Sequence, residues 1–153
     1  MNHYTFDDLN VGKRNSIEIT IREEDILAFA KLSGDMSPIH LDDNFARSKG
    51  FKSRIAHGAL LASYVSRFIG VYLPGANGLL QMIEMQFHRP CYPDTTIRIE
   101  GEVVRQIESV RVIRLKITLT DAGNEVVLAS GTVQSGILDI SIESRSESKG
   151  DLS

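Results

Sequence analysis

The sequence contains little cysteine, no excess of positive charge and no long uninterrupted apolar run. Cys91 is the single cysteine among 153 residues, which excludes an internal disulfide and any CxxC metal-binding motif. One thiol suits a reducing cytosol, so we expect a cytoplasmic location. The formal net charge is −3, whereas proteins that bind DNA or RNA normally carry a basic excess, and we therefore expect no nucleic-acid partner.

The most apolar stretch is GALLASYVSRFIGVYLPG at 58–75, which Arg67 interrupts and Pro74 limits. A helix that spans a membrane needs about 20 apolar residues, so we expect no membrane segment and interpret this stretch as a buried helix. The first residues, MNHYTFDDLNVGK, are polar and acidic, whereas an export signal has a basic start and an apolar run. We therefore expect no export signal.

Hydrophobic periodicity predicts the elements of the first half. The alternating segment 16–21 predicts a short strand. Apolar residues at near-helical spacing predict a helix over 22–34, with acidic residues in its first turn and Gly34 at its end. The longest helix is predicted over 58–73, with small residues on one face and large apolar residues on the other.

A shorter helix is predicted over 42–50, with Asp42 or Asp43 as its N-cap and Gly50 as its C-cap. The second half is rich in β-branched residues and is divided by turn motifs into four predicted strands: 79–88, 95–107, 110–121 and 125–138. The short connections favour antiparallel neighbours. Together these elements predict an α+β fold, in which a curved antiparallel sheet packs on one long helix.

We expect one domain over residues 1–139. Residues 140–153 are polar and show no periodicity, so we interpret them as a disordered tail.

The segment SGDMSPIH at 33–40 places Asp35 and His40 on opposite sides of Ser37-Pro38. Taken separately, Asp35 is typical of a turn that ends a helix, and His40 of a loop histidine with a hydrogen-bond partner. Taken together they suggest chemistry, because Pro38 stiffens the connection and could hold both side chains at a set separation. A carboxylate and a neutral imidazole that face one water can orient it and share its protons.

Gly58 follows in the segment RIAHG and is expected in the first turn of the long helix. Helix N-termini present unpaired N–H groups, and glycine lets a ligand carbonyl approach closely. Gly58 is therefore a candidate oxyanion donor. The alternative is that Gly58 simply begins the helix.

The segments FAKLSGDMSPIHLDDNFA and RIAHGALLASYVS resemble the MaoC-like hydratases, whose (R)-specific enoyl-CoA hydratases carry a Gly/Glu-Asp-x-Asn-Pro-x-His motif. The resemblance covers nearly the whole chain and implies a hotdog fold. It implies that Asp35 and His40 are catalytic, that Gly58 is the oxyanion donor and that Ser66 lies near the thioester. Ser37 stands where the family usually has asparagine, and a serine side chain can still form a hydrogen bond but reaches less far.

The implied activity is (R)-specific hydration of trans-2-enoyl thioesters, or the reverse dehydration of (R)-3-hydroxyacyl thioesters. The resemblance implies a homodimer or a higher homo-oligomer. It implies no cofactor beyond the coenzyme A or phosphopantetheine that is part of the substrate, which leaves acyl-CoA and acyl carrier protein both open as carriers. Two alternatives remain: a hotdog acyl-CoA thioesterase and a non-catalytic module that binds acyl thioesters.

A run of cations precedes Gly58 in ARSKGFKSR, and its members are possible contacts for coenzyme A phosphates or for an acidic carrier: Arg47, Lys49, Lys52 and Arg54. The alternative for this run is a solvated surface. His57 is expected to be structural. The sequence offers only one tight group of metal-ligand types, at His40, Asp42 and Asp43, so we expect no metal site.

Overall fold

The structure is a computed structural model that describes residues 1–139. The segment interpreted as a disordered tail, 140–153, lies outside the described residues. The helices are α1 (Glu23–Ser33), α2 (Pro38–Leu41), α3 (Asp43–Ser48) and α4 (Gly58–Val71), with short 3-10 helices at Phe6–Asp8 and Glu108–Val110. The strands are β1 (Arg14–Ile21), β2 (Gly78–Phe87), β3 (Thr95–Ile107), β4 (Val112–Asp121) and β5 (Val126–Ile137).

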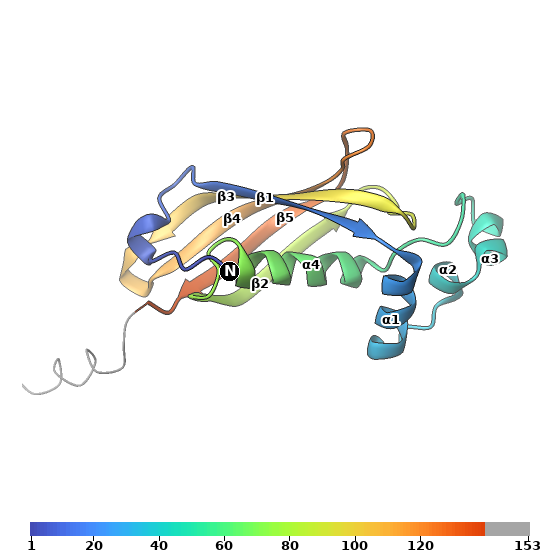
Figure 1. The fold of residues 1–153 in the computed structure, drawn as a ribbon, viewed down its shortest axis with the longest axis horizontal. Coiled ribbons are helices and arrows are strands. Elements are labelled where there is room, and N and C mark those ends of the chain that lie inside the picture. The colour runs from blue at the N-terminus through green and yellow to red at the C-terminus, as the bar shows by residue number, and fades with distance from the viewer. Residues whose placement is uncertain (140–153) are drawn as a thin grey trace, which may run out of the picture.

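The five strands form one antiparallel sheet in the order β1-β3-β4-β5-β2, which curves around α4 (Figure 1). The predicted α+β fold is confirmed. The predicted antiparallel arrangement of neighbouring strands is confirmed for every pair in the described sheet. Strands β3, β4 and β5 follow one another in the sheet, whereas β2 does not lie beside β3. Strand β3 lies between β1 and β4, so both of its edges are occupied, and β2 pairs instead with β5 through register partners such as Met85 and Gly131.

The core lies between the sheet and the large apolar face of α4. Val65 and Phe68 have no exposed surface and belong to one buried cluster with strand residues such as Ile99 and Ile117. Gly101 in β3 is needed for this contact, because a Cβ there would collide with the Phe68 ring. Within the described residues, no helix is both long and apolar enough to cross a membrane.

Helices α1, α2 and α3 lie together beyond the N-terminal end of α4 (Figure 1). Gly34 ends α1 in the left-handed conformation, with φ of 78°, as its position predicts. Asp42 is the N-cap of α3 and accepts hydrogen bonds from the N–H groups of Asn44 and Phe45. The structure differs from the prediction at α2, because Pro38 begins a helical turn that carries His40 where only a rigid bend is expected.

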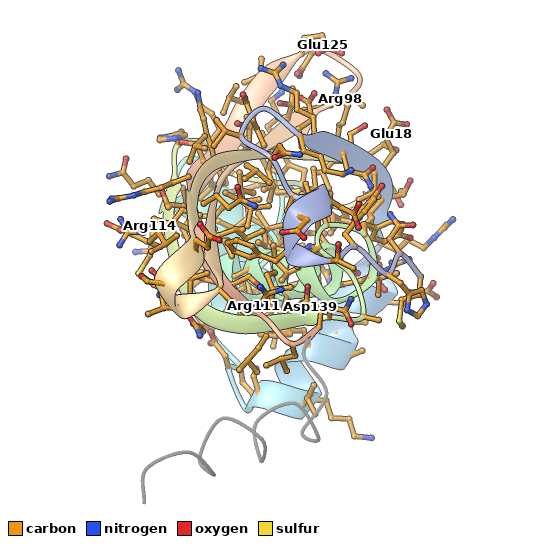
Figure 2. All side chains as sticks on the ribbon, turned by 90° about the vertical axis from the view of Figure 1, so that its left-hand side faces the viewer. Glu18, Arg98, Arg111, Arg114, Glu125 and Asp139 are labelled. Carbon is orange, nitrogen blue, oxygen red and sulfur yellow. The ribbon has the colours of Figure 1, made fainter. Side chains whose placement is uncertain are left out.

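The end of β5 is fastened to the beginning of the chain. The Asp139 carboxylate accepts a hydrogen bond from the N–H of Phe6 at 2.7 Å and pairs with the guanidinium of Arg111, beside which it is labelled in Figure 2. Burial alone would raise the pKa of Asp139, but these hydrogen bonds outweigh it and leave the pKa below its ordinary value. The ionised carboxylate therefore stabilises the junction of both ends of the domain.

Candidate functional site

Asp35 lies in an exposed turn directly after Gly34, the residue that ends α1. The N–H of Asp35 donates to the hydroxyl of Ser33 at 3.2 Å. One carboxylate oxygen, Oδ1, accepts a hydrogen bond from the main-chain N–H of Ser37 at 3.2 Å. Ser37 therefore supports Asp35 through its backbone, a contact that serine and asparagine supply equally well.

His40 lies in α2 and is partly buried. Its Nδ1 is 2.7 Å from the main-chain carbonyl oxygen of Ile55. A carbonyl only accepts hydrogen bonds, so Nδ1 carries the proton and the neutral ring keeps its lone pair on Nε2. The fold thus presents His40 with a nitrogen that is free to accept a proton.

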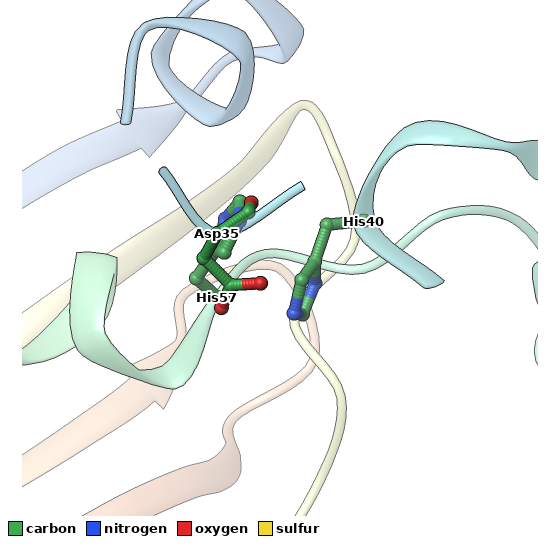
Figure 3. Close-up of side chains that lie close together, drawn as sticks. All are labelled: Asp35, His40 and His57. Atoms are coloured by element: carbon green, nitrogen blue, oxygen red, sulfur yellow. The ribbon is translucent and has the colours of Figure 1, made fainter. Parts of the chain in front are cut away.

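His57 lies beside these two residues, although only a structural role was predicted for it from the sequence. Its side chain is buried, and its ring stacks on that of His40 with the centroids 3.8 Å apart. Its Nε2 lies 3.0 Å from the main-chain carbonyl oxygen of Asp35. Ligand-type atoms of Asp35, His40 and His57 all lie within 4.8 Å of one another, and Figure 3 shows a carboxylate oxygen of Asp35 directed toward the His40 ring.

The same cluster has the residue types of a metal site but an unsuitable arrangement. The two imidazole rings are inclined by only 29° to each other. Stacked rings direct their in-plane lone pairs side by side, whereas metal ligands must converge on one ion. The expectation of no metal site stays a prediction, and the stacking geometry favours it.

Gly58 is the first residue of α4, as predicted. Its N–H has no carbonyl one turn earlier in the helix to bind, and it lies at the positive end of the helix dipole. A Cβ at this position would approach the ring of Phe87 to 3.1 Å. The absence of a side chain at Gly58 therefore preserves the small space between the N-terminus of α4 and the Phe87 ring.

A cavity of about 300 Å³ brings His40 and Gly58 onto a common wall. Its other walls are largely apolar and include Phe51, Leu61 and Phe87. A cavity with apolar walls and a few polar groups is typical of a site that binds a small organic ligand. The structure thus brings together two of the predicted site residues, His40 and Gly58.

Cys91 also lines the cavity, but its exposed fraction is only 2%. Burial raises the pKa of its thiol to about 12, so the thiolate is scarce near neutral pH. The thiol is therefore a wall of the cavity rather than a nucleophile.

Ser66 lies apart from this cavity. It is eight residues after Gly58 in α4, which corresponds to about 12 Å along the helix axis at 1.5 Å per residue. Its side chain is exposed, on the face of α4 opposite the buried residues, and it is not among the residues that line the cavity. The structure of one chain thus does not bring Ser66 to the position that the resemblance implies.

The four cations ahead of Gly58 do not behave alike. Arg54 forms ion pairs with Glu23 at 2.7 Å and with Asp43 at 3.1 Å, and only 18% of its side chain is exposed. The hydrogen bond from Arg54 lowers the pKa of Asp43 below its ordinary value. Arg54 therefore ties α1 to α3. The remaining members of the run are exposed: Arg47, Lys49 and Lys52.

Two members of the site, His57 and Arg89, were not predicted from the sequence as site residues. His57 was visible only as the neighbour of Gly58, and nothing in the sequence indicates that it stacks on His40. Arg89 is an exposed cation that lines the cavity, and it follows β2 in a segment without a recognisable motif. That Arg89 lines the same cavity as Phe51 could be found only from the fold, because the two residues are distant in the sequence.

Comparison with known proteins bears on this site. The MaoC like domain family matches residues 9–126. An (R)-specific enoyl-CoA hydratase of Rhodospirillum rubrum is 34% identical over 131 residues, which cover 86% of this chain and 90% of the relative. A 3-hydroxybutyryl-CoA dehydratase of Methylorubrum extorquens is 35% identical over 123 residues, which cover 80% of this chain and 78% of the relative.

A solved structure has the same architecture. The (R)-hydratase from A. caviae, described as involved in PHA biosynthesis, superimposes with a TM-score of 0.79 at 29% identity and covers 84% of this chain and 97% of its own. The structural similarity confirms the predicted hotdog fold. With a family match over most of the chain and relatives of this similarity, the chain belongs to the MaoC-like domain family.

Proposed function

We propose that this protein is a hydro-lyase that adds water reversibly to trans-2-enoyl thioesters and forms (R)-3-hydroxyacyl thioesters. One observation carries the proposal: His40 and Gly58 line the same cavity, and Asp35 lies in the same cluster as His40. The similarity to proteins named as (R)-specific enoyl-CoA hydratases supports the same reaction.

The positions of these three residues support the following reaction. The Asp35 carboxylate and the free Nε2 of His40 bind the attacking water between them. One of them takes a proton as the water oxygen bonds to C3, and the electrons of the C2–C3 double bond move toward the thioester oxygen. The Gly58 N–H stabilises the negative charge on that oxygen, and a proton is then returned to C2. A donor of this type contributes about 10²–10³ in rate.

The apolar walls of the cavity suit the acyl chain. We propose that the carrier is coenzyme A or an acyl carrier protein, and that the protein needs no separate cofactor. The exposed cations Lys49, Lys52 and Arg89 are the groups that support binding of the carrier's phosphates. Arg54 is unsuited to this role because two carboxylates already occupy it.

We further propose that the protein is a homodimer in the cytoplasm. Strand β2 forms one edge of the described sheet, and an unprotected edge strand is a template for pairing with a second chain. Leu79 and Phe87 at the two ends of β2 are about half exposed, at 48% and 49%. The exposed face of α4 that carries Ser66 supports the same arrangement, because a second copy would cover it.

A thioesterase is the second candidate from the same fold. Thioesterases of the hotdog fold usually carry a carboxylate on the central helix, whereas α4 contains neither aspartate nor glutamate. The third candidate is a non-catalytic binding module, which is considered because serine replaces the family's usual asparagine at position 37. The observed contact from Ser37 to Asp35 uses the main chain, so this serine does not favour loss of catalysis.

One assay separates the three functions. Incubation with crotonyl-CoA should lower the absorbance of the conjugated double bond to an equilibrium value without release of free thiol, and chiral analysis should identify the (R)-3-hydroxy product. Thiol release would indicate a thioesterase. Binding without any turnover, on acyl-CoA and on acyl carrier protein substrates, would indicate the binding module. An (S) product would contradict the proposed stereochemistry.

A further inference from the structure

The turn that carries Asp35 is weakly attached to the rest of the protein. Gly34, Asp35 and Met36 are exposed and belong to neither helix nor strand. The bonds to Ser33 and Ser37 join residues only two positions away, so they shape the turn without fixing its place relative to the cavity. A proton-transferring carboxylate must nevertheless be held within a fraction of an ångström of its partner.

One hydrogen bond supplies the missing attachment. Among the described residues, the contact between His57 Nε2 and the Asp35 carbonyl, at 3.0 Å, is the only hydrogen bond from the segment 34–37 that spans more than four residues. A carbonyl only accepts, so Nε2 donates and Nδ1 of the neutral ring keeps the lone pair. His57 is in turn fixed by burial and by the tilted ring of Phe29 at 5.0 Å.

The same side chain reaches the other members of the site. Its ring stacks on His40, and its main chain continues directly into Gly58, the first residue of α4. A single residue thus hydrogen-bonds to the main chain of Asp35, stacks on the proposed imidazole and is joined by a peptide bond to the proposed oxyanion donor. Any shift of His57 would change the distances between all of them.

Fold stability alone does not explain a histidine at this place. Nδ1 of His57 is buried and has no hydrogen-bond partner among the described residues. Leaving a polar atom buried without a partner costs stability, and an apolar ring of the same shape would avoid that cost. The imidazole is therefore retained at a cost to the fold, and the group that it offers to the site is the N–H of Nε2.

We infer that His57 is a positioning residue, which holds Asp35 in register with His40 and Gly58 through its hydrogen bond to the Asp35 carbonyl. The inference rests on the proposed hydratase function for its kinetic consequence, but the attachment of the turn is a property of the fold. His57 does not exchange protons with the substrate in this scheme, because its proton is engaged with a main-chain carbonyl.

The test compares His57→Phe with His57→Gln. Phenylalanine keeps a flat ring beside His40 but offers no donor, whereas the amide of glutamine can donate to the Asp35 carbonyl. We expect His57→Phe to lower kcat for crotonyl-CoA by at least about tenfold with KM changed by less than about threefold, the pattern of a loss confined to the transition state. His57→Gln should recover kcat to within about threefold of the natural protein.

The matched control is His3→Phe, the same substitution at an exposed residue far from the cavity, which should leave kcat unchanged. Thermal unfolding should show that His57→Phe keeps its stability, because it also removes the unpartnered Nδ1. If His57→Phe does not fold, His57→Met replaces it, since methionine also lacks a donor and adapts to irregular space. Equal kcat for the donor and non-donor variants would overturn the inference.

A second measurement does not depend on activity. Hydrogen exchange of peptides that cover residues 33–38 should be faster in His57→Phe than in the natural protein and in His57→Gln. Unchanged exchange in all three proteins would overturn the attachment. If the natural protein shows no hydration while exchange responds as expected, the proposed function fails and the role of His57 in holding the turn stands.

Discussion

His40 donates its Nδ1–H to the main-chain carbonyl of Ile55 over 2.7 Å, and this bond decides which of its nitrogens faces the chemistry. The lone pair on Nε2 and the Asp35 carboxylate act on one water in the proposed reaction. We expect Asp35→Asn and His40→Ala each to lower kcat by about 10²–10⁴ while the fold survives. The double variant should lose little more than either single one, because the two groups work as a unit. Near-normal turnover in either single variant would contradict a shared water.

The contact from the Ser37 N–H to Asp35 Oδ1 predicts a mild effect at position 37. Ser37→Asn restores the usual residue of the family but keeps the main-chain donor, so kcat should change by less than about tenfold, or about 1.4 kcal/mol. Ser37→Ala is the matched control and should behave alike. A much larger gain in Ser37→Asn would show that the natural protein is catalytically handicapped.

The exposed cations around the cavity predict a salt-sensitive effect on substrate binding. Replacing Lys49, Lys52 and Arg89 together by alanine should raise KM for acyl-CoA with little change in kcat, because the lost contacts act equally in the ground state and the transition state. The effect should shrink with added salt, since exposed charges are screened over about 8–10 Å at physiological ionic strength. The control replaces Arg105 and Lys116, two exposed cations of the sheet, by alanine. If KM stays unchanged for both CoA and carrier-protein substrates, the cations form a solvated surface and do not contact the substrate.

Arg54 is expected to act on stability and to leave KM almost unchanged. Its ion pairs with Glu23 and Asp43 join α1 to α3, and its side chain is mostly buried. Arg54→Met should therefore lower the free energy of unfolding by about 1–2 kcal/mol, which thermal or urea unfolding would measure. Arg47→Met, at an exposed position of the same run, should have a smaller effect. If Arg54→Met instead raises KM and leaves the free energy of unfolding unchanged, Arg54 contacts the substrate.

The Cys91 thiol should resist modification in the folded protein. Burial raises its pKa to about 12, and the thiolate is the reactive form. A thiol-specific reagent at pH 8 should react slowly with the natural protein and rapidly after unfolding in guanidinium. Rapid reaction of the folded protein would show that the cavity wall opens on the timescale of the assay.

The contact of Asp139 with Phe6 and Arg111 predicts an acid-sensitive stability. The pKa of Asp139 lies below its ordinary value of 3.8 in the folded protein, so the folded state binds this proton less readily than the unfolded chain does. The stabilisation is therefore present above about pH 4 and is lost as the pH falls through the lowered pKa. Asp139→Asn should lower the free energy of unfolding at pH 7, and the difference from the natural protein should narrow in acid. A difference that is independent of pH would contradict this assignment.

Much of the fold was predictable because local sequence patterns indicate most of its helices and strands. The bounds of α1, α4 and the strands follow from periodicity and from residues such as Gly34. The helical turn α2 was missed because Pro38 is equally typical of a turn and of a first helical position. The pairing of β2 with β5 was missed because an alternating pattern identifies a strand without identifying its neighbour.

Members of the candidate site could be named from the sequence where they lie in a recognisable motif. Asp35, His40 and Gly58 could be named from two motifs, whereas the stacking of His57 depends on how distant segments meet. Arg54 was named as a possible phosphate or carrier contact, and its ion pair with Glu23 could not be foreseen because the two residues come together only in three dimensions. The distance of Ser66 from the cavity likewise follows from the direction of α4, which no local pattern specifies.

The strand order β1-β3-β4-β5-β2 has a consequence for synthesis on the ribosome. Strand β1 has no partner until β3 emerges, and β2 has none until residues 129–137 of β5 emerge. The apolar face of α4 is therefore only partly covered while most of the chain already exists. Folding must therefore wait for β5, which is the last described strand. A nascent or truncated chain that ends before β5 exposes both the unpaired strand β2 and the apolar face of α4. Such chains are natural clients for chaperones, and loss of β5 should cause aggregation even though every residue of the proposed catalytic group is present.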